Sequence, residues 1–469
     1  MAQPLNYCPI RFQAIIQPEQ IAIKDEQHSL TFKLLDGRIN SLEKQLRLQG
    51  IKTGDRLVCI APNSVNLILL QLTCLRSGII FCPLNPRFSD PEITSRVAIL
   101  NSEFIYLAPT QSRLGLTSLP LNFTVDDTLE INNSQLNIDP LQVINIIFTS
   151  GSSGQAKAAM HNFSNHYYSA LGSQEVIPLQ RGDKNLLSLP LFHISGYAAV
   201  LRTLLAGATV VLSDSQLTAE QLKKLNITHL SLVNTQLSRL LENSEFKQRN
   251  LPIKHLLLGG SAFSQRLLKE TEQRGFNYHL SYGLTEMSSQ VATSSNNSSL
   301  FILKYRELKI IKGEIFLRGK TRFAGYFNGV MADSLLPEKQ WFASKDLGKK
   351  VGNRLQIIGR KDRQFICGGE NIQPEEIESL LLAFPGVKQA YVVAINDAAF
   401  GKRPVAFIDC LDEAPLQTAL DNYLKGKLSR YKRPIHYFAL PAQSAIKVSL
   451  KNLQQLAQKR ADKIICSAK

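Results

Sequence analysis

The sequence predicts an α/β protein, with a large N-terminal domain of layered, mainly parallel sheets and helices and a small α+β domain at the C-terminal end. Short apolar runs typical of buried strands alternate with longer stretches typical of amphipathic helices. This alternation favours parallel sheets whose faces are covered by helices. With 469 residues, 44% of them hydrophobic and 20% charged, the chain has the length and composition of a globular protein of two or more domains.

The predicted elements of the N-terminal part alternate between strands and helices. Buried strands are expected at 56–60, 79–83, 104–107 and 143–148, and helices at 65–75, 90–100, 164–171 and 219–225. The apolar stretch 67–84 is interrupted by Arg76, Ser77 and Gly78, which indicates a buried helix leading into a strand rather than a membrane span.

The composition changes after residues 359–362. Beyond this point the sequence predicts strands at 389–395 and 403–411 and a basic helix from Leu416. We therefore predict a domain boundary at Lys361, with a large domain over residues 1–360 and a small domain over residues 361–469.

The cysteines and the N-terminal segment indicate a cytoplasmic protein. The seven cysteines are odd in number and never paired as CxxC, which predicts a reducing compartment and no structural zinc. Residues 1–16 lack the continuous apolar core of a secretory signal.

The stretch VINIIFTSGSSGQAK at 143–157 carries the strongest functional signal. Its apolar run ends in small and hydroxyl side chains with unobstructed backbone N–H groups, and Lys157 closes the segment. Such a composition predicts an anion-binding nest that grips phosphate groups. Gly151, Gly154 and Lys157 are spaced by three, which does not fit a Walker loop. A flexible Gly/Ser surface loop is the alternative interpretation of this stretch taken alone.

Three further segments follow in order: SYGLTE at 281–286, WFASKDLG at 341–348 and IGRKDRQFICGGENIQPEEIE at 358–378. Together with the loop they resemble acyl-adenylate-forming enzymes, the superfamily of acyl-CoA and aryl-CoA ligases, luciferases and peptide-synthetase adenylation domains. The resemblance runs from about residue 32 to 453. It implies an enzyme that uses ATP and Mg²⁺ to form an acyl-adenylate, with CoA as a co-substrate.

The resemblance implies roles for the phosphate-binding residues. Thr285 would meet the α-phosphate, and Glu286 would help to bind Mg²⁺, because a carboxylate beside phosphates needs a cation between them. Taken alone, these two residues would indicate a helix N-cap with an acid in its first turn. The residues that would hold the β- and γ-phosphates are Thr149, Ser150, Gly151, Ser152, Ser153, Gly154 and Lys157.

A second set of residues would hold the nucleoside. By resemblance, Asp346 accepts hydrogen bonds from the ribose hydroxyls, and Arg360 lies beside the same ribose and phosphate. Tyr282 would stack on the adenine, with Gly283 next to it. A surface ion pair and a core aromatic residue are the alternatives. Backbone at Gly260 and Ser261 would approach the ring closely.

Residues near the C-terminal end are expected to act in catalysis, in rotation of the small domain and in CoA binding. Lys447 stands where the superfamily keeps its adenylation lysine, although Ile446 replaces the usual glycine before it. The resemblance makes the small domain mobile and Asp362 its hinge candidate. Gly368 and Gly369 would line a pantetheine channel, with a simple hairpin turn as the alternative. Further departures from the pattern are Ala156, Ala158 and Lys345.

Two segments, LPLFHISGYAAVLRTLLAG at 189–207 and SLVNTQLSRLL at 231–241, look most like the o-succinylbenzoate-CoA ligases of menaquinone and phylloquinone synthesis. Arg202 would hold the substrate carboxylate that stays on the benzene ring, because its fork is planar and always charged. His193, Ser231 and Thr235 complete the predicted substrate site, although His193 could equally be a core histidine and Arg202 a surface ion pair. Another aryl- or acyl-CoA ligase and a non-catalytic nucleotide-binding relative are the alternative functions.

The formal net charge of +16 is consistent with a protein that binds anionic small molecules. Apart from runs at 425–433 and 447–463, the basic residues are spread through the chain, whereas a nucleic-acid-binding protein would cluster them with aromatic neighbours. We expect the charge to attract ATP, pyrophosphate, CoA and an acid substrate, and we expect no nucleic-acid partner.

Overall fold

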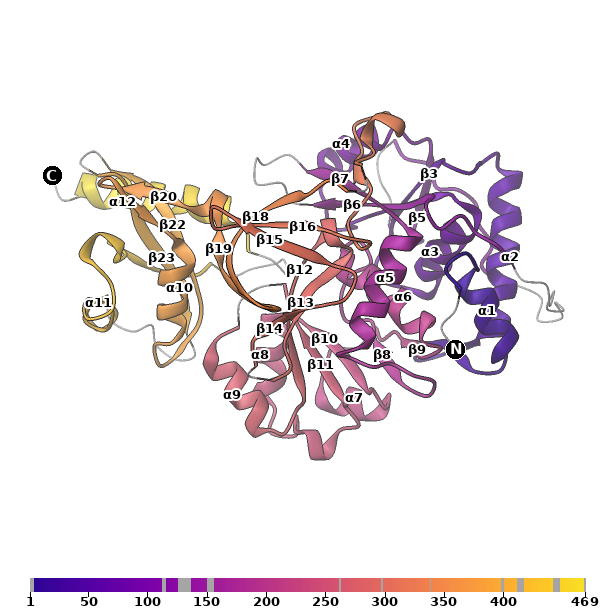
Figure 1. Cartoon of the computed structure of the whole chain (residues 1–469), viewed down its shortest axis with the longest axis horizontal. Coiled ribbons are helices and arrows are strands. Elements are labelled where there is room, and N and C mark those ends of the chain that lie inside the picture. The colour runs from indigo at the N-terminus through magenta and orange to yellow at the C-terminus, as the bar shows by residue number, and fades with distance from the viewer. Residues whose placement is uncertain are drawn as a thin grey trace.

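The computed structural model describes residues 4–111, 115–124, 136–149, 156–260, 263–296, 298–337, 339–397, 400–410, 417–441 and 448–467. A large N-terminal part and a small C-terminal part, light orange to yellow in Figure 1, lie on either side of the strand labelled β19. The predicted α/β class, with a large and a small domain, is confirmed.

A six-stranded sheet in the large part has the strand order β17-β7-β6-β4-β3-β5. Its strands β3, β4, β5 and β6 run parallel, and β7 and β17 add antiparallel neighbours. The elements are β3 (Arg56–Ile60), α3 (Val65–Ser77), β4 (Ile80–Leu84), α4 (Asp90–Leu100), β5 (Phe104–Leu107), β6 (Val143–Thr149), β7 (Lys157–Asn162) and β17 (Gly325–Tyr326). The prediction was within one residue for each of the first three strands, because short apolar runs buried on both faces are the signature of parallel strands.

In a thirteen-stranded sheet, the strands from β1 to β12 pair in parallel, the strands beyond β12 pair antiparallel, and the edge strand β2 is antiparallel to β1. Its parallel part and the helices around it are α1 (Pro9–Ile16), β1 (Ile21–Lys24), α2 (Phe32–Leu48), α5 (Phe163–Gln174), β8 (Lys184–Leu186), α6 (Ile194–Leu205), β9 (Thr209–Val211), α7 (Ala219–Lys224), β10 (His229–Leu232), α8 (Asn234–Glu242), β11 (His255–Leu258), α9 (Gln265–Gln273) and β12 (Tyr278–Leu284), with β2 (Ser29–Thr31) on the edge. The antiparallel part comprises β13 (Ser289–Thr293), β14 (Leu300–Ile302), β15 (Glu307–Ile311), β16 (Glu314–Arg318), β18 (Phe342–Val351) and β19 (Arg354–Arg360).

The small part has its own sheet and its own core. The hairpin β22 (Val387–Asp397) and β23 (Gly401–Cys410) pairs with β24 (Tyr437–Ala439). Helices α10 (Pro374–Leu382), α11 (Gln417–Lys425) and α12 (Leu450–Ser467) and the hairpin β20 (Phe365–Cys367) and β21 (Glu370–Ile372) complete it. Its two apolar clusters contain no residue before Phe365. The separate cores support a boundary near Lys361, whose position stays a prediction.

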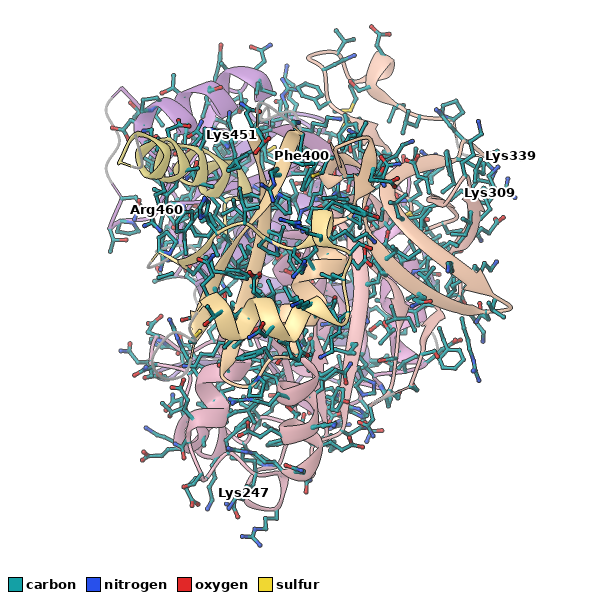
Figure 2. The ribbon with its side chains drawn as sticks, turned by 90° about the vertical axis from the view of Figure 1, so that its left-hand side faces the viewer. Lys247, Lys309, Lys339, Phe400, Lys451 and Arg460 are labelled. Carbon is teal, nitrogen blue, oxygen red and sulfur yellow. The ribbon has the colours of Figure 1, made fainter. Side chains whose placement is uncertain are left out.

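Basic side chains project from many elements rather than from one strip. Figure 2, which faces the small part, shows Lys451 and Arg460 on α12, Lys247 at the opposite end of the molecule, and Lys309 and Lys339 along another edge. No helix within the described ranges is long and apolar enough to cross a membrane.

A buried ion-pair cluster ties the first three helices together. Asp36 on α2 accepts from Arg11 Nε of α1 at 2.9 Å, and its other oxygen accepts from Arg76 of α3. All three side chains are buried. Because two guanidinium groups share one carboxylate, loss of the carboxylate would leave two buried positive charges facing each other.

Replacing Asp36 by alanine should therefore lower the free energy of unfolding by about 3–5 kcal/mol, the usual cost of stranding a buried charge. Urea unfolding followed by circular dichroism measures this. The exposed Asp214 is the matched control, and Asp214→Ala should change stability by less than about 0.5 kcal/mol. Equal effects of the two substitutions would contradict the role of the cluster.

Candidate active site

The predicted phosphate loop joins two antiparallel strands. Thr149, the last residue of β6, pairs with Lys157, the first residue of β7. A Walker loop leads from a strand into a helix, so this connection is of a different kind, as the glycine spacing predicted. The predicted residues Ser150, Gly151, Ser152, Ser153 and Gly154 lie outside the described residues.

A short turn at the end of β12 places Glu286 near Lys157. Thr285–Met287 form a 3₁₀ turn whose N-cap is Leu284, so Thr285 is not the N-cap of the alternative interpretation, although Glu286 does lie in the first turn. The Glu286 carboxylate accepts from the Tyr326 hydroxyl. Lys157 Nζ lies 4.9 Å from the centre of the Tyr326 ring. The site thus brings one lysine and one carboxylate to the same tyrosine.

His161 on β7 forms a hydrogen bond to the backbone of this turn. The sequence analysis did not predict a role for it. Its Nε2 lies 2.7 Å from the Thr285 carbonyl oxygen, which can only accept, so this nitrogen carries the proton. Nδ1 then accepts from Asn145 Nδ2 at 3.2 Å, and the Asn145 oxygen accepts from His166 Nε2 at 2.8 Å. Burial lowers the pKa of His161 to about 4, so the ring is neutral at physiological pH. No local sequence pattern marks this residue, because its partner Thr285 lies 124 positions away in the chain.

The predicted ribose residues come together around Asp346. Tyr282 Oη donates to Asp346 Oδ2 at 2.6 Å, and Arg360 Nη1 donates to Oδ1 at 3.2 Å. The Arg360 guanidinium also makes two bonds to Asp362, of 2.9 and 2.8 Å. Burial raises the pKa of Asp346, while the bond from Tyr282 and the charge of Arg360 oppose that shift. Burial and the nearby Asp346 carboxylate raise the pKa of Tyr282, which keeps its donor proton.

Three residues next to this site have a sterically demanding backbone. Lys345, which stands where the resembling superfamily has glycine, has a left-handed φ of 64°. Its N–H donates to Glu314 Oε1 at 3.2 Å. A Cβ on Gly283 would lie 2.1 Å from the Ser289 carbonyl oxygen, so only glycine fits between β12 and β13. Ser289 itself has a φ of 99°, and such strain is common beside functional sites.

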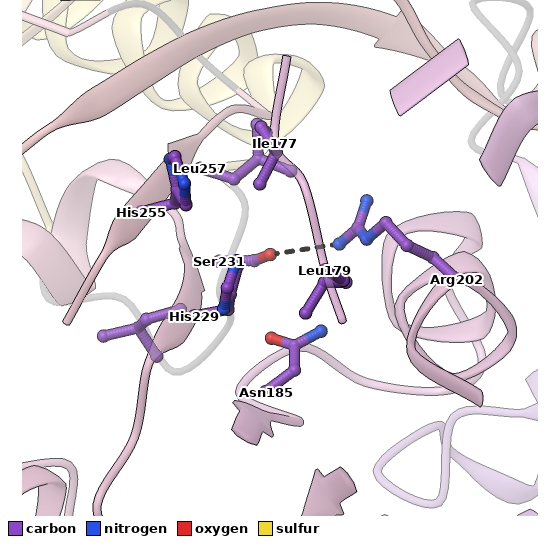
Figure 3. A pocket seen from close by; sticks show the side chains of 9 residues that line it. Ile177, Leu179, Asn185, Arg202, His229, Ser231, His255 and Leu257 are labelled. Carbon is purple, nitrogen blue, oxygen red and sulfur yellow. Dashed lines mark hydrogen bonds between the residues drawn. The ribbon is translucent and has the colours of Figure 1, made fainter. Parts of the chain in front are cut away.

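Arg202 and Ser231, two predicted substrate residues, meet in a buried pocket (Figure 3). Arg202 Nη2 makes a long hydrogen bond of 3.5 Å to Ser231 Oγ. Arg202 is 7% exposed, so the alternative of a surface ion pair is wrong. The pocket is also lined by Ile177, Leu179, Asn185, His229, Leu230, His255 and Leu257.

The other predicted substrate residues lie elsewhere. His193 is exposed at the start of α6, which excludes the alternative of a core histidine. Thr235 is half-buried in the first turn of α8. Neither lines the pocket that holds Arg202. Substrate contacts of these two residues stay predictions.

The remaining predicted residues are placed as follows. Gly368 and Gly369, with φ of 58° and 90°, form the two-residue turn between β20 and β21, which requires glycine-like backbone. Asp362 lies in the 3₁₀ turn Lys361–Arg363 that follows β19. Gly260, with a φ of 86°, lies two residues beyond the end of β11. Ser261 and Lys447 lie outside the described residues.

The fold and these motifs define an adenylate-forming type of enzyme, and family comparison agrees. The family described as AMP-binding enzyme matches residues 11–327, and its C-terminal domain matches residues 376–445. The chain belongs to the AMP-binding enzyme family.

Among relatives, the 2-succinylbenzoate–CoA ligase of Escherichia coli (strain K12) is 32% identical over 459 residues, covering 96% of this chain and 98% of that protein. The enzyme of the same name from Bacillus subtilis (strain 168) is 29% identical over 453 residues, covering 91% and 93%. An E. coli MenE variant with bound OSB-AMS aligns with a TM-score of 0.86 at 32% identity, covering 98% of this chain and 100% of its own. B. subtilis MenE with ATP and a magnesium ion aligns with a TM-score of 0.83 at 27% identity, covering 96% and 99%.

The buried neutral state of His161 makes the stability of the fold depend on pH. Its folded pKa of about 4 lies below the ordinary value of 6.5, so the unfolded chain binds more protons between these values. Stability should therefore fall as the pH falls from about 6.5 to about 4, by an amount on the order of 3 kcal/mol for this residue.

His161→Gln keeps an N–H donor for the Thr285 carbonyl but cannot titrate. Its free energy of unfolding, measured in urea at several pH values, should decrease less on acidification than that of the wild type. Parallel pH profiles for the two proteins would contradict the assignment of His161 as a buried neutral donor.

Proposed function

We propose that this chain is an o-succinylbenzoate-CoA ligase, which joins o-succinylbenzoate to CoA through an acyl-adenylate and releases AMP and pyrophosphate. One observation carries the choice of acid: Arg202 is a buried cation with no carboxylate partner among the described residues. The names of the relatives support the same substrate.

The electrostatics of Arg202 favour an anionic substrate. Burial lowers the pKa of Arg202 to about 10, which still leaves it charged at neutral pH. Its described hydrogen-bond partners, Gln290 and Ser231, are neutral. A buried charge is costly unless it is paired, so the pocket is completed by an anion. The benzene-ring carboxylate of o-succinylbenzoate has the charge and the planar, two-oxygen shape that a guanidinium binds best.

In the first half-reaction, an oxygen of the aliphatic carboxylate attacks the α-phosphorus of ATP. The bond from that phosphorus to the bridging oxygen breaks, and pyrophosphate leaves with the electron pair. The phosphate loop and Lys157 would hold the leaving phosphates, and Thr285 would contact the α-phosphate. Lys447 would bridge the carboxylate and the α-phosphate oxygens, bringing two anions together.

The residues near Lys157 fit a magnesium ion. Glu286 supplies a hard carboxylate oxygen, and only its Oε1 accepts a hydrogen bond from a described residue. When bound, Mg²⁺ neutralises charge on the phosphates. Asp346 would accept from the ribose hydroxyls beside Arg360, while Tyr282 would lie against the adenine.

In the second half-reaction, the CoA thiolate attacks the acyl carbon, and the bond from that carbon to the AMP oxygen breaks. We propose that residues 361–469 rotate about Asp362 between the two steps, which removes Lys447 and brings Gly368 and Gly369 to the pantetheine arm. The product would serve menaquinone or phylloquinone synthesis in the cytoplasm, where ATP and CoA are available.

The function is tested by incubating the purified chain with ATP, Mg²⁺ and o-succinylbenzoate. Without CoA, pyrophosphate release should stop at about one molecule per enzyme molecule, because the adenylate stays bound. Addition of CoA should restore turnover, with AMP and o-succinylbenzoyl-CoA as products. Benzoate, acetate and palmitate are the comparison acids. Preference for one of these, or no pyrophosphate release with any acid, would overturn the assignment.

Arg202→Ala should lower kcat/KM for o-succinylbenzoate by roughly 100-fold, about 3 kcal/mol, while the KM for ATP changes little. The analogue 4-oxo-4-phenylbutanoate lacks the ring carboxylate, so it should be a poor substrate of the wild type and lose much less on substitution.

The matched control is Arg239→Ala, which removes an exposed arginine from α8 and should leave both substrates unaffected. If Arg202→Ala reduced activity on the two acids in equal proportion, Arg202 would be a structural residue and the choice of substrate would lose its main support.

A further inference from the structure

Gln290 is a buried neighbour of Arg202 to which the sequence motifs give no role. It lies on β13, is 2% exposed, and its Oε1 accepts from Arg202 Nη1 at 3.3 Å. The two residues are 88 positions apart in the chain. A long polar side chain buried to this degree needs partners for both ends of its amide.

The orientation of the Gln290 amide follows from its second partner. Gln290 Nε2 donates to Thr293 Oγ1 at 2.9 Å, and Thr293 is itself buried. With the nitrogen committed to this hydroxyl, the amide oxygen faces the guanidinium, which can only donate. Gln290 therefore presents Arg202 with an acceptor that has no net charge.

The backbone of Gln290 is held just as firmly. Arg306 Nε donates to the Gln290 carbonyl oxygen at 2.9 Å, and Gln290 pairs with Gly283 across the two strands. The rest of the Arg306 guanidinium is bound by the carbonyl oxygens of Tyr168, Lys304 and Ser169. The amide is thus fixed relative to β12, the strand that also carries Tyr282.

The neutrality of Gln290 matters for selectivity. A glutamate has the same shape and would form a buried ion pair with Arg202, which would cancel the charge that a substrate anion must meet. Ser231, the other described partner of Arg202, is also neutral. The guanidinium is therefore oriented from two sides, and among the described residues no carboxylate neutralises its charge or accepts from its remaining N–H groups.

We propose that Gln290 is a specificity-determining positioning residue: its amide aims the Arg202 guanidinium and leaves it unneutralised, so that the enzyme selects acids that carry a second carboxylate on the ring. This inference rests on the proposed function, because it assumes that Arg202 faces the acid substrate.

The test measures kcat and KM for o-succinylbenzoate and for 4-oxo-4-phenylbutanoate with the wild type, Gln290→Glu and Gln290→Met. Gln290→Glu should lower the ratio of the two kcat/KM values by roughly 30-fold or more, because it pairs the arginine internally. Gln290→Met removes the acceptor but adds no charge, so it should raise the KM for o-succinylbenzoate roughly threefold to tenfold and preserve most of the preference. The exposed Gln273→Glu controls for an added negative charge and should match the wild type.

The outcomes separate the inference from the proposed function. A wild type that does not use o-succinylbenzoate would overturn the function itself. An active wild type with an unchanged substrate ratio in Gln290→Glu, or an equal loss on both acids in both variants, would overturn the role of Gln290 alone. If thermal melting showed that Gln290→Glu does not fold, Gln290→Met would decide: a rise in KM confined to o-succinylbenzoate supports the inference, and unchanged or equally reduced kinetics overturn it.

Discussion

The close approach of β12 and β13 is the constraint on which the candidate site depends. No side chain fits at Gly283, because the Ser289 carbonyl oxygen occupies the place of its Cβ. Between β12 and β13 the large sheet changes from parallel to antiparallel pairing. Tyr282 directly precedes Gly283 on β12, and Gln290 on β13 pairs with Gly283. The proposed nucleotide and acid subsites are therefore built on two paired strands: Gln290 pairs with Gly283, the residue next to Tyr282, so backbone hydrogen bonds set the spacing of the subsites.

Neutral polar groups surround the charges of the site. Burial keeps His161 and His166 neutral beneath the Thr285 turn. Next to Arg202, burial lowers the pKa of His229 to about 4. Neutral hydrogen-bonding groups of this kind orient charged side chains without neutralising them. The positive potential of the arginine and lysine side chains is therefore available to anionic ligands.

The sequence was sufficient for elements defined by local pattern. Helix Asp90–Leu100 has an acidic first turn and Pro at its start, and strands Arg56–Ile60 and Phe104–Leu107 are short apolar runs, so their bounds were predicted correctly. The antiparallel strands after β12 were not predicted, because segments such as Phe342–Val351 mix polar and apolar residues without a clear period.

The candidate site divides in the same way. Tyr282, Asp346 and Arg360 could be named in advance because each lies in a contiguous motif, and the structure places them in contact. Gln290 and His161 could not, because their importance arises from partners 88 and 124 residues away. Long-range hydrogen bonds leave no periodic or compositional signal in the chain.

Arg360 has a consequence for how nucleotide binding and domain orientation depend on each other. Its guanidinium holds Asp362 through two bonds but Asp346 through one. Rotation at the proposed hinge that carried Arg360 along with Asp362 would break the single bond and leave Asp346 with one less cation. The affinity for ATP would then differ between the two orientations. By thermodynamic reciprocity, ATP binding would then shift the equilibrium between the two domain orientations by the same factor. The orientation of the small domain would therefore depend on whether ATP is bound.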